Sequence, residues 1–387
     1  MERCDVLVVG GGAMGTASAW QLAKHSTKRC VVLEAQPFGH EKGSSHGESR
    51  IYRKTDTDPL LARMAIDALP LWRELEADSG VQVLRTVGGI DVGPAGGDAM
   101  QRIVANSRGV PGARVLKGEA IAEALPGMGP IPADAVAVAQ PDGAIINAAV
   151  AVETMRREAT RHGARFVPEA RVVAITRPVD GGDVYTVRTA GGATFVAHHV
   201  VLTAGAWTSE ALGLLGVPLR SEIWQMQYGF WEVDAAAVED HTHGPVWRSF
   251  YDRLYGFPIN EKAGHIKLAQ HNVSKANTFH HPRDVTYAVS MAVLEATDRE
   301  VKRLLHGLGP YHPGPPCLYT VAADGKFVLG DLPGTAGRVV VAGAFAGSGF
   351  KHVPHVGKIV KDLVCHGRTE IDVSPFCPGR EALRPRL

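Results

Sequence analysis

The sequence predicts an α/β fold in which a mostly parallel sheet carries a second, α+β layer. Three observations support this. The first 34 residues read as strand, helix and strand, the middle of the chain changes to short β-rich runs, and the chain closes with another strand, a glycine-rich loop and a helix. Strands that alternate with helices imply a parallel sheet. A chain of 387 residues is also long enough for two domains.

The N-terminal unit combines an apolar strand over residues 5–9, a helix over 13–25 and a second strand over 30–33. Between the first strand and the helix lies Gly10-x-Gly12-x-x-Gly15. The first glycine permits the tight turn, the second lets the backbone approach a pyrophosphate, and the third lets helix and strand pack closely. The helix N-terminus adds free N–H groups and a positive dipole end for phosphates. The unit therefore predicts a dinucleotide site.

An acidic residue completes this pattern. Glu34 follows the second strand, 19 positions after Gly15. A carboxylate in that place accepts hydrogen bonds from ribose hydroxyls and disfavours the 2′-phosphate of NADP. The pattern alone leaves both FAD and NAD open as the bound dinucleotide.

The next elements continue the domain. Apolar residues recur at helical spacing over 58–79, where we expect Pro70 to kink or divide the helix. A second helix is expected over 147–162. The runs 184–188 and 194–202, separated by the Gly191-Gly192 turn, predict a hairpin that returns to the sheet.

The second layer is expected over 217–316, with aromatic strands at 223–233 and 254–268 and a helix near 286–306. After Cys317 the pattern predicts a strand over 339–342, a glycine loop over 343–349 and a helix over 350–365. We therefore assign residues 1–80, 145–216 and 317–387 to a nucleotide-binding domain. Residues 81–144 and 217–316 are assigned to a β-rich substrate domain interleaved with it.

Bulk properties exclude several functions. The formal net charge of +1 gives no reason to expect a nucleic-acid or membrane partner. The five cysteines are scattered without a CxxC pair, so neither a disulfide framework nor a metal site is expected.

The N-terminus has no signal peptide pattern and no run of 18 apolar residues is present, which indicates a cytoplasmic protein. The alternative is a peroxisomal address in the C-terminal Pro385-Arg386-Leu387.

Three later motifs point to a family. They are GSSHGESRIYR over 43–53, CLYT over 317–320 and GAFAGSGFK over 343–351. In order and spacing, over essentially the whole chain, the sequence resembles the monomeric sarcosine oxidase family, which includes N-methyltryptophan oxidase and L-pipecolate oxidase. The resemblance implies a monomeric FAD-dependent oxidase. It also implies a Rossmann-type FAD-binding domain in the two-domain architecture of glutathione reductase and D-amino-acid oxidase.

The resemblance implies that FAD is covalently attached through Cys317. A single cysteine without that motif is more simply a small buried apolar residue. His46 and Arg50 would lie against the isoalloxazine ring, and Arg50 with Lys267 would surround it with positive charge that stabilises its anionic reduced form. The other residues implied to bind FAD are Gly10, Gly12, Ala13, Met14, Gly15, Glu34, Ser45, Val172, Ala204, Gly205, Gly347, Gly349, Phe350 and Lys351.

The same resemblance implies a clamp on a substrate carboxylate, formed by Arg53 and Lys351. A guanidinium suits this task because it makes two parallel charge-assisted hydrogen bonds. Without the motifs, the sequence would predict that Arg53 is an ordinary surface arginine and that Lys351 is a solvated helix residue. Tyr319 matches a substrate-binding position, although it and Tyr255 also fit as core aromatics. The residues implied to be catalytic are Lys267, His271, Arg50, His46 and Tyr255.

Two departures from the family concern the substrate pocket. Ser348 stands where the family usually has histidine, and the segment from Trp224 to His271, which sets substrate shape, diverges.

The implied reaction is oxidation of a small secondary amine that bears a carboxylate. The product is an imine or aldehyde, with dioxygen reduced to hydrogen peroxide. Both N-methyl amino acids such as sarcosine and cyclic imino acids such as pipecolate remain open as substrates.

Three alternatives remain at this point. One is a specialised FAD-dependent imino-acid oxidase or dehydrogenase of a biosynthetic pathway. Another is an NAD-dependent dehydrogenase, because the glycine pattern serves both dinucleotides. The third is a flavin-binding structural or chaperone-like protein. The predicted crowding of His46, Arg50, Lys267 and Lys351 around one ring argues against this last reading.

Overall fold

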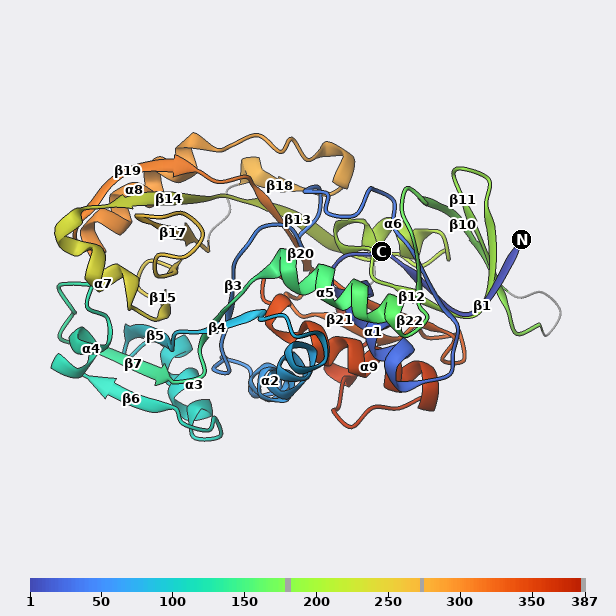
Figure 1. Cartoon of the computed structure of the whole chain (residues 1–387), viewed down its shortest axis with the longest axis horizontal. Helices are drawn as coiled ribbons and strands as arrows, with labels where there is room; N and C mark the ends of the chain where they lie inside the picture. Colours follow the sequence, from blue (N-terminus) through green and yellow to red (C-terminus); the bar gives the residue numbers. More distant parts are fainter. Residues whose placement is uncertain (178–181, 272–274, 384–387) are drawn as a thin grey trace.

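The computed structural model describes residues 1–177, 182–271 and 275–383 (Figure 1). Two large sheets occupy its two ends, and the chain passes between them several times. The C-terminal Pro385-Arg386-Leu387 lies outside the described residues. Among the described helices, none is both long and apolar enough to cross a lipid bilayer.

The first sheet has eight strands and is centred on β1 (Glu2–Val9). Its parallel strands, from one side to the other, are β9 (Arg165–Val167), β2 (Cys30–Leu33), β1, β12 (Thr194–Leu202) and β22 (Val339–Gly343). Three antiparallel strands extend it: β10 (Val172–Thr176), β11 (Tyr185–Thr189) and β21 (Val328–Asp331). The predicted strand–helix–strand unit and the predicted hairpin are confirmed.

Helices pack on this sheet and on one another, which buries their apolar faces. α1 (Ala13–His25) packs on both α5 (Ala148–Arg161) and α9 (Val353–His366), and α2 (Pro59–Ser79) packs on α9. Two side chains cap their helices: Asp58 accepts from the Leu60 amide at 2.8 Å, and Asn147 accepts from the Val150 amide at 3.2 Å.

The expected division of α2 at Pro70 is wrong. The helix runs unbroken from Pro59 to Ser79. Its buried side chains Met64, Trp72 and Leu75 hold both halves in one core. Tertiary packing on both sides of the proline therefore outweighs the loss of one backbone hydrogen bond.

The second sheet also has eight strands, in the order β19-β14-β17-β16-β15-β5-β7-β6. It lies at the left in Figure 1. In that order, the bounds are Leu308–Pro313, Tyr228–Val233, His265–Gln270, Leu254–Gly256, Val246–Ser249, Gly89–Pro94, Ala135–Gln140 and Arg114–Lys117. Its strands come from the ranges 81–144 and 217–316 that we assigned to the substrate domain, whose limits stay a prediction. Its helices are α3 (Asp98–Ser107), α4 (Glu119–Ala124), α7 (Val238–Thr242) and α8 (Met291–Leu304).

Two small sheets join the large ones. One consists of β3 (Arg50–Tyr52), β8 (Ala144–Ile146) and β4 (Leu84–Thr86). The other consists of β18 (Thr278–Phe279), β13 (Ser221–Met226) and β20 (Cys317–Ala322). After β12 follow the short 3₁₀ helix η1 (Gly205–Trp207) and α6 (Thr208–Gly213). These connections bring β3 and β20, which carry several predicted site residues, to the space between the two large sheets.

Four predicted elements differ in their limits. The run 223–233 is two strands in different sheets, β13 and β14, because the chain crosses between sheets at Gln227. The Gln227 side-chain amide fixes that crossing by donating to the Gly314 carbonyl at 2.6 Å. The run 254–268 is likewise the two antiparallel strands β16 and β17. The helix expected from 286 begins at Met291, and α9 is preceded by a 3₁₀ turn, η5 (Phe350–His352).

Candidate active site

A cavity of about 1360 Å³ lies between the two large sheets. It is larger than the pockets of about 300–1,000 Å³ that hold drug-sized ligands. Of the predicted site residues, only Gly15 and His46 are not among those that line it. The lining includes Gly10, Gly12, Ala13, Met14, Glu34, Ser45, Arg50, Arg53, Val172, Ala204, Gly205, Tyr255, Lys267, His271, Cys317, Tyr319, Gly347, Gly349, Phe350 and Lys351.

One end of the cavity is the glycine turn after β1. Gly10 has a φ of +110°, and a Cβ there would lie 2.5 Å from the Thr203 carbonyl oxygen. A Cβ on Gly15 would lie 1.8 Å from the Gly10 carbonyl oxygen. Neither position has room for a side chain, so the turn brings bare backbone to the cavity wall. Ser45 reaches the same turn, where its hydroxyl accepts from the Ala13 amide at 3.0 Å.

Glu34 holds the turn from the end of β2. Its carboxylate accepts from the Gly11 amide at 2.8 Å and from the Gln36 amide at 2.9 Å. Burial alone would raise the pKa of Glu34, but hydrogen bonds from His40 and from these two amides lower it overall. The carboxylate is therefore ionised and fixed at the cavity wall, as an acceptor for ribose hydroxyls requires.

The last glycine loop, which follows β22 in the same sheet as β1, also lines the cavity. Gly347 has a φ of +75°, and a Cβ there would lie 2.2 Å from the Tyr319 ring. Phe350 follows in η5, and its ring lies 5.5 Å from the Arg50 guanidinium carbon. Backbone thus approaches the cavity closely in both glycine-rich segments, as the binding of an extended dinucleotide such as FAD needs.

The cavity is electropositive where Cys317 faces it. The Arg50 guanidinium donates to the carbonyl oxygens of His46 at 2.7 Å, Ser44 at 3.0 Å and Ser49 at 2.7 Å. These acceptors are neutral, so the guanidinium charge is retained. Burial raises the pKa of the Cys317 thiol, whereas Arg50 and Lys267 act in the opposite direction. The pKa of Cys317 is raised overall, so the two cations offset only part of the effect of burial, which disfavours the thiolate that a covalent bond to a flavin needs.

Lys267 is paired with a carboxylate that the sequence did not indicate. Its ammonium donates to Glu261 Oε1 at 2.9 Å and to Ser49 Oγ at 3.1 Å. It also lies 4.1 Å from the centre of the Tyr228 ring. Burial lowers the pKa of Lys267, and Glu261 opposes that shift.

Arg53 and Lys351 meet at one carboxylate. Lys351 Nζ lies 2.8 Å and Arg53 Nη1 lies 3.1 Å from the same atom, Asp56 Oδ2. All three side chains are buried. Burial would raise the pKa of Asp56, but the two cations hold it well below its ordinary value. Burial and the nearby Arg53 lower the pKa of Lys351 to about 7, against the opposing effect of Asp56.

A second ion pair adjoins the first. Arg248 Nε donates to Asp91 Oδ1 at 2.6 Å, and Thr55 donates to the other Asp91 oxygen at 2.5 Å. Arg248 Nη2 is buried and has no hydrogen-bond partner among the described residues. Arg248 lines the cavity, and its charge lowers the pKa of both Arg53 and Lys351. We call these side chains the cationic cluster: Arg53, Asp56, Asp91, Arg248 and Lys351.

The remaining side chains that the sequence predicted to be catalytic or substrate-binding are aromatic and uncharged. They are His46, His271, Tyr255 and Tyr319. Burial and the charges of Arg50 and Lys267 lower the pKa of His46 to about 4. Tyr319 packs at 5.8 Å from His271, and its pKa is raised by burial to about 12. Burial also raises the pKa of Tyr255 well above its ordinary value. His271 and both tyrosines line the cavity, whereas His46 lies outside its lining.

Four charged residues of the site were missed by sequence reasoning. Asp56 stands three positions after Arg53 and Glu261 six before Lys267, so local spacing offered a weak signal for both. Asp91 and Arg248 come from β5 and β15, which pair in parallel although they are distant in sequence. Neither residue carries a local signal for this contact.

Comparison with known proteins agrees with this geometry. The family model for FAD dependent oxidoreductases matches residues 5–363. A probable sarcosine oxidase of Arabidopsis thaliana is 32% identical over 372 residues, covering 93% of this chain and 88% of that protein. A monomeric sarcosine oxidase of Bacillus sp. (strain NS-129) is 28% identical over 397 residues, covering 98% and 97%. Among solved structures, the open form of NikD, described as an unusual amino acid oxidase essential for nikkomycin biosynthesis, matches with a TM-score of 0.81 and 27% identity, covering 98% of both chains.

The fold and the cavity define a two-domain FAD-dependent oxidoreductase, which selects FAD over NAD as the dinucleotide. Within that class, the chain belongs to the sarcosine oxidase family, which also contains the N-methyltryptophan oxidases.

Proposed function

We propose that this protein is an FAD-dependent oxidase of a small secondary amine that carries one carboxylate. The electron acceptor is dioxygen, and the products are an imine, which hydrolyses to an aldehyde where the amine is acyclic, and hydrogen peroxide. The observation that carries this proposal is the cationic cluster, because its three cations, Arg53, Arg248 and Lys351, line the same cavity as Cys317 and Lys267.

The charge balance of the cluster supports a single carboxylate as its ligand. The cluster holds three cationic side chains and two carboxylates. One positive charge therefore remains when Lys351 is protonated. Arg248 Nη2 is a buried donor without a partner among the described residues, and such donors are costly unless a ligand satisfies them. One substrate carboxylate supplies both the charge and the acceptor.

The residues at the ring end have separate tasks. FAD, when bound, supplies the two-electron chemistry, accepting hydride equivalents from the carbon next to nitrogen and passing electrons to dioxygen. Arg50 and Lys267 supply a positive field that stabilises negative charge as it develops. The high pKa values of Tyr255 and Tyr319 keep their hydroxyls neutral, so they add no charge that would hold the amine in its protonated form.

We also propose that Cys317 forms the covalent bond to FAD. It lines the cavity beside Tyr319 and lies within the electrostatic influence of two cations. Acid precipitation of freshly purified protein should leave the yellow colour in the pellet, and the Cys317→Ser variant should release it. Flavin in the supernatant of the unmodified protein would refute the attachment.

Two substrate classes fit the proposal, and one observation supports each. The sarcosine oxidase relatives support an N-methyl amino acid. The structural similarity to NikD supports a second candidate, an imino-acid oxidase specialised for a biosynthetic pathway. In both cases we propose a monomer, and its cytoplasmic location stays a prediction.

The test uses matched substrate pairs that differ only in the carboxylate. Peroxide release should be much faster with sarcosine than with dimethylamine, or with L-pipecolate than with piperidine. Arg53→Met should raise the Michaelis constant for the acid member of the active pair, because the cluster then has no excess positive charge and the buried substrate carboxylate is left unpaired, at a cost of about 3–5 kcal/mol. Equal rates within both pairs would overturn the proposed carboxylate anchor.

A further inference from the structure

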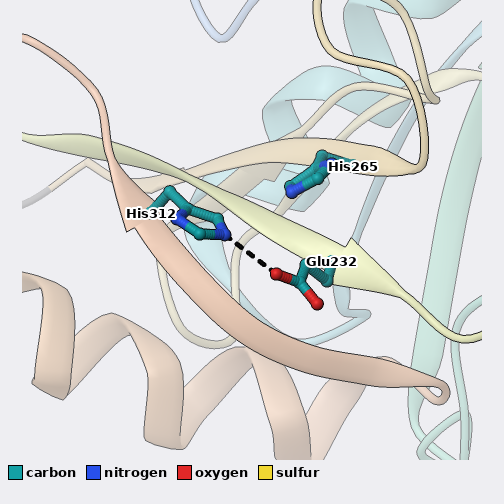
Figure 2. Close-up of side chains that lie close together, drawn as sticks. All are labelled: Glu232, His265 and His312. Atoms are coloured by element: carbon teal, nitrogen blue, oxygen red, sulfur yellow. Dashed lines mark hydrogen bonds and ion pairs between the residues drawn. The ribbon is translucent and has the colours of Figure 1, made fainter.

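A group of three side chains lies on the second sheet, and none of the three lines the cavity. Glu232, His265 and His312 come from β14, β17 and β19, three neighbouring strands (Figure 2). Their candidate ligand atoms all lie within 4.8 Å of one another. This spacing is compatible with a metal ion between them.

The strand register explains why the three side chains meet. Glu232 lies directly opposite His265 in the antiparallel pair of β14 and β17. On the other side of β14, His312 pairs with Phe230, two positions from Glu232 and therefore on the same face. An irregularity in the register between Trp231 and Val233 brings β19 close at this point. The backbone of three paired strands thus fixes the arrangement.

His265 is oriented as a metal ligand is. Its Nδ1 lies 2.8 Å from the Ala263 carbonyl oxygen. A carbonyl only accepts hydrogen bonds, so Nδ1 carries the proton and Nε2 of the neutral ring has a free lone pair. Nε2 is buried and has no hydrogen-bond partner among the described residues. Metal-bound histidines typically donate their other ring N–H to a carbonyl or carboxylate in this way.

The other two ligands are accessible from solvent. His312 Nε2 lies 2.9 Å from Glu232 Oε1, and both side chains are about half exposed, at 48% and 45%. This bond is the dashed line in Figure 2, with the His265 ring beside it. Coordination through His312 Nε2 needs that nitrogen to be free of its proton, so the metal ion would replace the hydrogen bond between His312 and Glu232. An ion could therefore enter from solvent without unfolding the sheet.

We propose that Glu232, His265 and His312 form a binding site for a divalent transition metal of the Zn²⁺ type. Two imidazoles and one carboxylate match the ligands that Zn²⁺ prefers, whereas Mg²⁺ and Ca²⁺ prefer oxygen ligands alone. Three protein ligands leave at least one position for water. Because β19 is the edge strand, the ion links that edge to the two strands inside it.

The test measures Zn²⁺ binding to the FAD-loaded protein after dialysis against a chelator. Calorimetric titration with ZnCl₂ should show one more equivalent bound by the unmodified protein than by His265→Gln or His312→Gln. Each variant should weaken that binding about tenfold or more, since even indirect partners of metal ligands contribute about 10–100-fold. His243→Gln is the matched control. It removes an exposed histidine that lies 3.4 Å from Glu239 without a third ligand in the described structure.

A melting experiment separates loss of the site from loss of the fold. In chelator, all four proteins should melt at the same temperature, because His312 is half exposed and His265 is partly exposed. Zn²⁺ should raise the melting temperature of the unmodified protein and of His243→Gln, but not of the two site variants. MgCl₂ should raise none of them. Equal Zn²⁺ stoichiometry and equal thermal shifts in all four proteins would overturn the proposal, as would the absence of binding to the unmodified protein.

Discussion

Lys351 is the residue at which we expect charge and substrate binding to be most closely coupled. It is buried against Arg53, and this environment lowers its pKa to about 7, although Asp56 opposes the shift. Below that pH the ammonium is charged and the cationic cluster has one uncompensated positive charge. Above it the lysine is neutral and the excess charge is lost.

Carboxylate binding should therefore weaken as pH rises through about 7. Acetate, whose own charge is constant in this range, is a suitable ligand. Its dissociation constant, measured from the change it causes in the flavin spectrum, should increase towards about tenfold per pH unit on the alkaline side. The Lys351→Met variant should bind acetate more weakly and with no such pH dependence. The same slope in the variant would assign the titration to another group.

We propose that Lys267 determines how fast electrons reach dioxygen. A fixed cation lowers the barrier for negative charge that appears only as dioxygen is reduced. Lys267→Met should slow reoxidation of the reduced enzyme by roughly 100-fold or more. Anaerobic reduction by substrate should change much less, because it depends on the cationic cluster.

Stopped-flow measurement of both half-reactions is the test for Lys267. Lys262→Met is the control, since Lys262 belongs to the same segment but does not line the cavity. Equal slowing of the two half-reactions would show that Lys267 has a structural role. Because Glu261 lies 2.9 Å away, that outcome would point to the ion pair itself.

Among the individual site residues, the sequence predicted the cationic side chains more readily than the carboxylates that pair with them. The motifs around Arg53, Lys351 and Cys317 led to residues that line one cavity. Asp56 and Glu261, which neutralise part of that charge, were not recognised because acidic residues a few positions away usually face solvent. The three ligands of the proposed metal site were also missed, since they are far apart in sequence and meet only through strand register.

Among the elements, the glycine turn between β1 and α1 constrains the cofactor end of the cavity. A Cβ at Gly15 would lie 1.8 Å from the Gly10 carbonyl oxygen, so α1 would have to move away from β1. Gly15→Ala should cost about 1–3 kcal/mol of stability. It should also lower the flavin-to-protein ratio of the purified enzyme.

Gly191→Ala is the control for that prediction. Its Cβ would meet nothing within 4 Å, and it lies in the turn between β11 and β12. Absorbance spectra and thermal melts of both variants give the two readouts. A normal flavin content in Gly15→Ala would show that close packing of α1 on β1 is not required for FAD binding.

Elements were predictable where one local pattern covers a whole element. The helix at 13–25 and the strand at 30–33 have the predicted limits, because apolar spacing and glycines mark both ends. The run 223–233 was read as one strand because aromatic residues continue across Gln227. The change of sheet there depends on contacts with Gly314 and on pairing with β19 and β20, which no local pattern contains.

For the whole molecule, the essential feature is that one cavity has walls from both sheets. β1, β2, β22 and the segment that follows β12 provide the dinucleotide end, while β15, β16 and β17 provide the other wall. The sequence predicted this interleaved architecture through the family resemblance. It could not show that β5 and β15 pair in parallel, and that pairing places Asp91 beside Arg248.

The central claim is that this chain oxidises a carboxylate-bearing secondary amine and passes the electrons to dioxygen. The most direct measurement is the visible flavin absorbance of the purified enzyme, first without and then with dioxygen. Anaerobic addition of the active acid, sarcosine or L-pipecolate, should bleach the flavin, whereas dimethylamine or piperidine should not. When the acid is added at one equivalent per flavin, dioxygen should then restore the absorbance and release hydrogen peroxide in an amount equal to the flavin. Bleaching by the amines without a carboxylate, or a flavin that stays reduced under dioxygen, would contradict the account.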